Sequence, residues 1–252
     1  MTARTPTAVD PDELADELRP LLDRALLGFD VDGVLAPIVT HAADARLTPG
    51  VHAALDELAR RTDVAILSGR SLGDLERLFS FPAGVHVIGS HGLEVRGLDA
   101  VALDADEQYT FDQLELLGRK AVDVAGDGAW LEYKPASVVV HTRTADPARA
   151  RPAVDALARL ARMVDGAQVK PGHEVVELLA RSASKGQALL ALAHRLARSP
   201  LVFLGDDVTD EDAFALMADD DISVRVGDGS TVARYRLAGP EAVARLLVLL
   251  GG

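Results

Sequence analysis

Five short apolar runs, each ending at a polar residue or a glycine, constrain the fold of this chain most. They are residues 25–29, 64–67, 85–88, 201–204 and 222–226. Stretches with apolar residues at helical spacing lie between them, as in 51–61 and 185–198. Short buried strands that alternate with helices predict an α/β fold, with helices on both faces of a parallel sheet. Functional side chains of such sheets gather where the strands end.

The middle of the chain has a different pattern. Residues 137–143 alternate as in a strand, with His141 and Arg143 on one side. A helix is predicted over 147–163, followed by a turn at Pro171-Gly172 and a strand over 174–179. The pattern predicts a small α+β unit inserted into the sheet domain, in the form of a lid.

These patterns divide the chain into three parts. Residues 1–24 are expected to form a loose tail and a helix that Pro20 kinks or ends. Residues 25–97 and 181–252 are expected to form the catalytic core. Residues 98–180 are expected to form the inserted α+β cap.

Composition excludes several classes of function. The 252 residues carry a formal net charge of −13, which disfavours nucleic acid and anionic membranes as partners. There is no cysteine, so disulfides, thiolate metal sites and a cysteine nucleophile are excluded. No stretch reaches the roughly 20 apolar residues of a membrane span, and the acidic N-terminus is not that of a secretory signal. We expect a cytoplasmic protein; the sequence leaves the oligomeric state open, with a monomer as the default.

An acidic motif follows the first apolar run. Asp30 and Asp32 stand two residues apart, and Gly33 permits the chain to turn after them. One carboxylate can attack phosphorus while the other moves protons, and a hard cation can bridge carboxylate and phosphate oxygens. An acidic turn that only closes a strand is the alternative.

A second acidic cluster follows the fourth run. Asp210 and Glu211 suit a helix N-terminus, where the helix dipole favours acids. Asp206 and Asp207 are poorly explained in this way, because neighbouring carboxylates after a buried strand repel one another unless a cation compensates. The cluster therefore indicates a metal or lysine nearby.

Two weaker motifs can contact phosphate. Ser68-Gly69-Arg70 follows the second run and offers a hydroxyl, a flexible backbone and a guanidinium at a helix start. Lys185 follows Ser184, a plausible helix N-cap. Taken alone, a Ser-Gly turn is usually structural, and a lysine at a helix start is usually a solvated charge.

Together, these motifs resemble those of the haloacid dehalogenase superfamily of phosphatases. The resemblance covers about 25–97 and 181–230, and it implies a Rossmann-like core and a Mg²⁺ cofactor. It implies that Asp30 is the nucleophile and that Asp32 is the general acid and base. The implied phosphoryl-group ligands are Ser68 and Lys185. The implied metal site contains the side chains of Asp30 and Asp206 and the backbone carbonyl of Asp32, with Asp207 nearby. Val34 departs from the pattern, since many members have Thr there.

The inserted region resembles the cap of trehalose-6-phosphate phosphatases. Glu132-Tyr133-Lys134 with His141 and Arg143 matches the family pattern E-x-K…H-x-R, and Glu177 falls at the sugar-contacting position of its hairpin. The implied substrate ligands are Gly69, Arg70, Glu132, Lys134, His141, Arg143 and Glu177. Where the family often has Ile-Arg-Pro after the hairpin glutamate, this chain has Leu178-Leu179-Ala180. A polar cap face without a ligand is the alternative for any one of these residues alone.

Three functions remain open on the sequence. The first is hydrolysis of trehalose 6-phosphate, a small-molecule sugar phosphate, through an aspartyl phosphate. The second is the same chemistry on another substrate, such as glucosylglycerol phosphate or mannosylglycerate phosphate. The third is a non-catalytic sugar-phosphate binder or regulator, which the joint presence of Asp30, Asp32, Lys185 and Asp206 disfavours.

Overall fold

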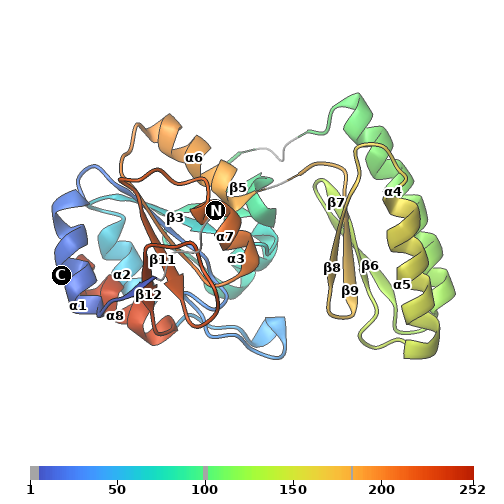
Figure 1. The fold of residues 1–252 in the computed structure, drawn as a ribbon, viewed down its shortest axis with the longest axis horizontal. Coiled ribbons are helices and arrows are strands. Elements are labelled where there is room, and N and C mark those ends of the chain that lie inside the picture. Colours follow the sequence, from blue (N-terminus) through green and yellow to red (C-terminus); the bar gives the residue numbers. More distant parts are fainter. Residues whose placement is uncertain (1–5, 99–101, 183) are drawn as a thin grey trace. The chain divides into compact units, whose positions relative to one another are not determined.

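The computed structural model describes residues 6–98, 102–182 and 184–252, and the chain divides into two compact units (Figure 1). One unit contains residues 1–99 and 183–252, and the other contains residues 100–182. The sequence placed the inserted region at 98–180, so the division falls within two residues of the expected positions. Residues 99–101, next to the first expected boundary, lie outside the described residues.

The first unit is built on an eight-stranded sheet with the order β1-β12-β11-β10-β2-β3-β4-β5. Neighbouring strands run parallel except at β4 and β5, which pair antiparallel. The strands are β1 (Thr7–Ala8), β2 (Leu26–Phe29), β3 (Asp63–Leu67), β4 (His86–Gly89), β5 (Glu94–Val95), β10 (Leu201–Gly205), β11 (Ile222–Val226) and β12 (Tyr235–Leu237). The five apolar runs of the sequence are therefore strands β2, β3, β4, β10 and β11.

Helices cover both faces of this sheet, as the sequence predicts (Figure 1). Their buried residues belong to two apolar clusters, one on each face. One face packs against α1 (Pro11–Leu18), α2 (Val51–Leu58), α3 (Leu72–Phe79) and α8 (Pro240–Gly251). The other face packs against α6 (Lys185–Leu196) and α7 (Val208–Phe214).

The N-terminal region differs from the expected loose tail. Thr7 and Ala8 form β1 and pair with β12, which ties this segment to the sheet edge. Residues 1–5 of the expected tail lie outside the described residues. Helix α1 ends at Leu18 and passes into a 3₁₀ turn over Arg19–Leu21, which confirms that the α-helix stops before Pro20.

The second unit, here called the insert, is a four-stranded antiparallel sheet with two helices on one face (Figure 1). The strand order is β6-β7-β9-β8. Its elements are α4 (Ala105–Ala125), β6 (Trp130–Lys134), β7 (Ser137–His141), α5 (Pro147–Ala161), β8 (Gln168–Gly172) and β9 (Val175–Leu179). Leu131, Val138, Val140, Val176 and Leu178 point to the helices and form the core of the insert.

Two expectations for the insert were wrong. The predicted turn at Pro171-Gly172 is the end of strand β8, and the reversal comes one step later at His173 and Glu174. Glu174 takes the left-handed conformation there, with φ 57°. Strand β7 ends at His141, so Arg143 lies beyond the strand and does not continue its alternation.

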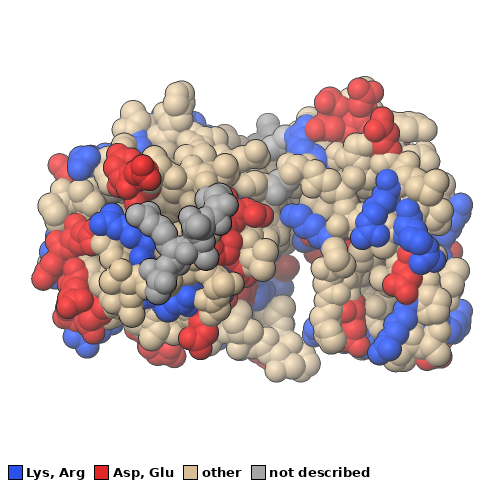
Figure 2. Space-filling view, viewed as in Figure 1, with Lys and Arg blue, Asp and Glu red and all other residues tan. Residues whose placement is uncertain are grey.

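Charge is unevenly distributed on the surface (Figure 2). Asp12, Glu13, Asp16 and Glu17 give α1 an acidic surface, and Figure 2 shows acidic side chains gathered on that side of the first unit. Helix α5 instead exposes arginines at positions 149, 151 and 159. Among the described residues, no helix is both long and apolar enough to cross a membrane.

Candidate active site

Three neighbouring strands of the first sheet end at candidate site residues. Asp30 follows β2, Ser68 follows β3, and Asp206 follows β10. Strand β2 pairs with β10 on one side and with β3 on the other, all in parallel. The carboxyl ends of the three strands therefore meet at one edge, as the sequence predicts for functional side chains.

Lys185 connects this edge to helix α6. It is the first residue of the helix, which Ser184 caps through the Gln187 N–H, and its side chain is only 2% exposed. Lys185 Nζ donates to Asp30 Oδ2 at 2.7 Å and to Asp210 Oδ1 at 2.9 Å. The interpretation of Lys185 as a solvated charge is therefore excluded.

Asp210 is the site residue that the sequence interpretation missed. It was assigned to the solvated N-terminus of a helix, but its side chain is fully buried. Its Oδ2 accepts the N–H groups of Asp206 at 2.9 Å and Asp207 at 3.1 Å. Asp210 therefore holds both the Lys185 ammonium and the loop after β10 in place. A Cβ at Gly205 would clash with the Asp210 side chain. The glycine directly before the acidic residues is therefore the sequence feature that could have indicated a buried Asp210.

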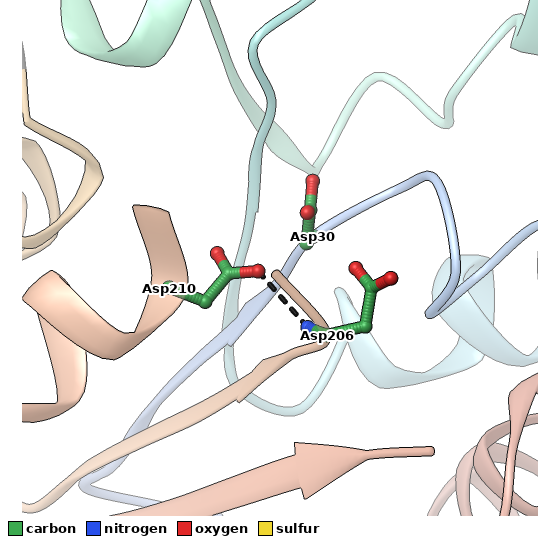
Figure 3. A group of neighbouring side chains, drawn as sticks. All are labelled: Asp30, Asp206 and Asp210. Atoms are coloured by element: carbon green, nitrogen blue, oxygen red, sulfur yellow. Dashed lines mark hydrogen bonds between the residues drawn. The ribbon is translucent and has the colours of Figure 1, made fainter. Parts of the chain in front are cut away.

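Oxygen atoms of Asp30, Asp206 and Asp210 lie within 4.8 Å of one another, close enough to share a metal ion (Figure 3). Three carboxylates facing the single ammonium of Lys185 leave two negative charges when all are ionised. Hard divalent cations prefer such oxygen ligands. The group therefore fits a divalent cation in both charge and donor type.

Asp207, which the family resemblance implies near the metal, lies outside this group of side chains, and the Asp32 backbone carbonyl stays the expected contact of that residue. Asp207 caps helix α7 instead, since its Oδ1 accepts the N–H groups of Thr209 at 2.8 Å and Asp210 at 3.1 Å. Burial would raise the pKa of Asp207, but Lys185 and these hydrogen bonds outweigh it and hold the pKa below its usual value. Asp207 is thus an ionised helix cap beside the candidate metal ligands.

Gly33 makes room for the Asp206 carboxylate. It has φ +79°, and a Cβ at this position would collide with the Asp206 side chain. Burial, with Asp210 and Asp207 nearby, raises the pKa of Asp206 to about 6. A carboxylate with a raised pKa next to other acids is one that a bound cation would stabilise in its charged form.

Asp30 and Lys185 form a buried ion pair. Burial raises the pKa of Asp30, and Lys185 opposes this shift. Burial alone would lower the pKa of Lys185, but Asp30, Asp210 and Asp207 outweigh it and raise the pKa above its usual range. Lys185 is therefore a permanent cation, and Asp30 Oδ1 also accepts the Val31 N–H at 2.6 Å.

Asp32 is held by Arg70. The guanidinium donates from Nε to Asp32 Oδ2 and from Nη2 to Asp32 Oδ1, each at 2.6 Å. Arg70 also donates from Nη1 to the Ala42 carbonyl at 3.1 Å and lies over the Phe79 ring. This two-point pairing fixes the Asp32 carboxylate in one orientation.

Ser68 and Gly69 lie in a loop that the segment after β4 holds in place. Ser68 is buried, and its Oγ accepts the Arg70 N–H at 3.2 Å. The Ser68 and Arg70 carbonyls accept the N–H groups of His91 at 2.9 Å and Ser90 at 2.8 Å. A Cβ at Gly69 would lie 2.7 Å from the His91 ring, so the close packing of the two loops requires glycine there.

The insert carries the remaining predicted residues on the sheet face opposite its helices. Glu132 Oε2 lies 2.8 Å from His141 Nε2, across the β6–β7 pair. Glu177 Oε1 accepts from Ser137 Oγ at 2.7 Å and from Lys134 Nζ at 3.3 Å. Arg143 is not with them: it lies beyond β7, 64% exposed, with Nε 3.8 Å from Glu174 Oε2.

Comparisons with known proteins agree with this architecture. A family model described as trehalose-phosphatase matches residues 28–241. A Mycobacterium marinum trehalose-phosphate phosphatase is 35% identical over 259 residues, covering 92% of this chain and 64% of that protein. This chain thus spans less than two thirds of the length of that relative.

Solved structures share the fold. The C-terminal domain of the C. albicans trehalose-6-phosphate phosphatase superposes with a TM-score of 0.76 at 24% identity, covering 100% of this chain and 99% of that one. The C-terminal domain of a Candida albicans trehalose synthase regulatory protein superposes with a TM-score of 0.71 at 14% identity, covering 99% of this chain and 100% of that one. With the family match over residues 28–241 and the 35% identity, these findings show that the chain belongs to the trehalose-phosphatase family.

Proposed function

We propose that this chain is a Mg²⁺-dependent phosphatase that hydrolyses trehalose 6-phosphate through an aspartyl phosphate on Asp30. The observation that carries the proposal is the buried Lys185 ammonium, 2.7 Å from Asp30 and 2.9 Å from Asp210, beside the Asp206 carboxylate. Burying the charges of Lys185, Asp30 and Asp210 is costly for a fold, and strongly perturbed charges of this kind cluster at catalytic sites.

Asp30 attacks phosphorus in the first step. A carboxylate oxygen of Asp30 forms the new bond to phosphorus, and the bond between phosphorus and the sugar oxygen breaks. Asp32 gives its proton to the departing sugar oxygen, so trehalose leaves as an alcohol. For this step the Asp32 carboxyl must carry a proton, which it takes up from solvent as the substrate binds and the pairing with Arg70 opens.

Water completes the cycle in the second step. Asp32, now ionised, accepts a proton from the water as the water oxygen attacks phosphorus, and the bond to Asp30 breaks. Inorganic phosphate leaves, Asp30 is restored as a carboxylate, and Asp32 again carries a proton. Once Asp32 is ionised, its pairing with Arg70 forms again and orients the carboxylate for this role. Ser68 lies next to Arg70 in the same loop.

Asp30 and Asp206 would hold the cation, because the carboxylate of Asp210 is already committed to Lys185 and to two backbone N–H groups. Mg²⁺ suits this oxygen site and, when bound, neutralises phosphate oxygens during phosphoryl transfer. Lys185 supplies a second, permanent positive charge beside Asp30. These two charges invert locally the field of a chain whose net charge is −13.

We assign recognition of the sugar to the insert. Glu132, His141, Lys134 and Glu177 share one sheet face and offer both donors and acceptors for sugar hydroxyls. The family match and the name of the Mycobacterium marinum relative support trehalose 6-phosphate as the substrate. We therefore propose that the insert is the cap of this enzyme and that it selects the substrate.

A second candidate is the same chemistry on a different sugar phosphate, such as glucosylglycerol phosphate or mannosylglycerate phosphate. Leu179 favours this second candidate, because trehalose-6-phosphate phosphatases often have arginine at this position of the cap hairpin and this chain has a buried leucine. Loss of a cation from the sugar-facing strand would change which hydroxyls or charges the cap accepts.

A phosphate-release screen across sugar phosphates tests the proposal. The full chain with Mg²⁺ should release phosphate fastest from trehalose 6-phosphate. Glu177→Gln should raise KM for that substrate and leave hydrolysis of p-nitrophenyl phosphate unchanged, because the small ester has no sugar for the insert to hold. The matched control is Glu174→Gln, at an exposed turn of the same hairpin. Release from no sugar phosphate would contradict an enzymatic function and favour a regulator.

A further inference from the structure

Trp130 begins strand β6 and is half exposed, although it is the one tryptophan of the chain. Its neighbour Leu131 points to the insert's helices and joins their apolar core. Because side chains alternate along a strand, Trp130 lies on the opposite face with Glu132 and Lys134. This is the face that carries the proposed sugar ligands.

The indole ring has a fixed orientation. It stacks on the imidazole of His141 with ring centroids 3.9 Å apart and an angle of 5° between the planes. His141 Nε2 in turn lies 2.8 Å from Glu132 Oε2, so three side chains from two strands form one connected group. With one indole face covered by His141, the 51% of Trp130 that remains exposed includes the other face.

Neither of the two helices described in the insert packs on this sheet face. Helices α4 and α5 both pack on the other face, through the Leu131 side of the strands (Figure 1). Aromatic rings with flanking hydrogen-bonding groups suit ligands that are apolar on one side and polar at the edge.

We propose that Trp130 is a stacking platform for a pyranose ring of the substrate, the ring that carries no phosphate. The C–H groups on one side of a pyranose would pack on the open indole face. Its hydroxyls, which project from the ring edge, would meet Glu132 and His141. This inference rests on the proposed function of the chain as a sugar phosphatase and identifies its substrate as a disaccharide phosphate.

The distribution of charge on this sheet face suggests which end of it binds each pyranose ring of the substrate. Lys134 lies at the far end of β6 from Trp130, and Lys170 on β8 is in register with Glu177. Four residue steps separate Trp130 from Lys134, or about 13 Å along an extended strand. That length exceeds one pyranose ring. Lys134 is paired with Glu177, and Lys170 adds a second cation, so this Lys134 end is net positive and suits the phosphorylated ring. Among the described strand residues, the end with the indole carries no Lys or Arg on this face and suits the neutral ring.

Fluorescence provides a direct test, because Trp130 is the sole tryptophan. The full-length Asp30→Asn variant with Mg²⁺ is titrated with trehalose 6-phosphate, trehalose, glucose 6-phosphate and inorganic phosphate. Both disaccharides should change the Trp130 emission, trehalose at higher concentration, while glucose 6-phosphate and phosphate leave it unchanged. Equal changes with glucose 6-phosphate and trehalose 6-phosphate would overturn the inference, as would no change at concentrations where calorimetry shows that trehalose 6-phosphate binds.

Steady-state kinetics gives an independent readout. Trp130→Ala should raise KM for trehalose 6-phosphate about tenfold or more with kcat nearly unchanged, and Trp130→Phe should restore most of the loss. Hydrolysis of p-nitrophenyl phosphate should be the same in all three proteins. Tyr133→Ala is the matched control, because Tyr133 is 50% exposed on the same strand but bonds to Glu115 on the helix side. Its KM should equal that of the unsubstituted protein.

The outcomes separate this inference from the proposed function. If the unsubstituted protein hydrolyses trehalose 6-phosphate and Trp130→Ala has the same KM, the stacking role is wrong and the function stands. If another sugar phosphate is the better substrate, the same titration is run with that ester. A change in Trp130 emission would then support stacking on its neutral part, and a constant emission would overturn it.

Discussion

Lys185 Nζ lies 2.7 Å from Asp30 Oδ2, although the two residues are 155 positions apart in the sequence. Both side chains are nearly inaccessible, at 2% and 6% exposure. The sheet places Asp30 at the end of a central strand, and Ser184 starts helix α6 so that its first residue faces this strand end. One contact therefore joins the two segments of the first unit at the candidate nucleophile.

Removing the ammonium should destabilise the protein and abolish turnover. Lys185→Met leaves buried carboxylates without a counter-charge, and breaking a buried pair in this way costs about 3–5 kcal/mol. The double variant Lys185→Met with Asp210→Asn should recover part of that stability, since one uncompensated acid is gone, but no activity. Urea denaturation and phosphate release measure the two effects.

Lys120→Met is the control for this experiment, because Lys120 is exposed on α4. It should change neither stability nor turnover. Equal stabilities of Lys185→Met and Lys120→Met would contradict the buried ion pair.

Arg70 and Asp32 should act as one unit. Loss of a general acid–base group typically lowers rate about 10²–10⁴-fold. Asp32→Asn and Arg70→Met should each lower kcat, and the double variant should be no slower than Asp32→Asn alone, because Arg70 acts through the Asp32 carboxylate. A double-variant cycle on kcat tests this. Multiplicative losses would show that Arg70 has a role of its own.

Gly33 should affect Mg²⁺ binding because it leaves space for the Asp206 carboxylate, in addition to its role in the backbone turn. Gly33→Ala and Gly97→Ala meet similar strain, since the two glycines have φ +79° and +77°, but a Cβ at Gly97 meets no atom within 4 Å. The left-handed backbone alone should cost each variant about 1–2 kcal/mol of stability. Only Gly33→Ala displaces the Asp206 carboxylate, so it alone should raise the half-saturating Mg²⁺ concentration, by about tenfold. Equal Mg²⁺ requirements would mean that Asp206 is not a ligand.

Stability of the metal-free protein should depend on the titration of Asp206. Burial with Asp210 and Asp207 nearby raises the pKa of Asp206 to about 6 from the ordinary value of 3.8. The folded protein therefore binds more protons than the unfolded chain between these values, and this group's stabilising contribution is lost as pH rises through about 6. In chelator, the melting temperature of Asp206→Asn relative to the unsubstituted protein should rise from pH 4 to 6 and then level off.

The control for the pH experiment is Asp219→Asn, at an exposed position. Its melting-temperature difference from the unsubstituted protein should stay nearly constant over the same range. A constant difference for Asp206→Asn as well would contradict the raised pKa.

The sheet of the first unit was predictable because its strands are continuous apolar runs. Strands β2, β3, β4, β10 and β11 each coincide with such a run. Helix α4, the longest helix described, was not predicted, because its sequence shows no clear apolar pattern at helical spacing. Its buried positions are Thr110, Leu114, Gly118, Ala121 and Ala125, which are mostly small or polar. Small side chains let α4 pack closely on α5 and β7, and they carry little of the apolar periodicity that marks a helix.

The site was predictable in its motifs and less so in its contacts. Asp30, Ser68 and Asp206 end adjacent strands as expected, but the burial of Asp210 depends on Lys185, 25 residues away, and on the missing Cβ of Gly205. Local sequence gave Asp210 a sufficient explanation as a helix N-terminal acid. A long-range ion pair cannot be read from spacing within one segment.

Identification of the phosphorylated residue tests directly whether Asp30 is the nucleophile. The full chain with Mg²⁺ and trehalose 6-phosphate is quenched in acid during turnover and analysed by peptide mass spectrometry, with Asp30→Asn treated in parallel. We expect a phosphate on Asp30 in the unsubstituted protein, and neither phosphopeptide nor phosphate release in a folded Asp30→Asn protein. Phosphate on a different residue, or substantial turnover by folded Asp30→Asn, would contradict this role of Asp30.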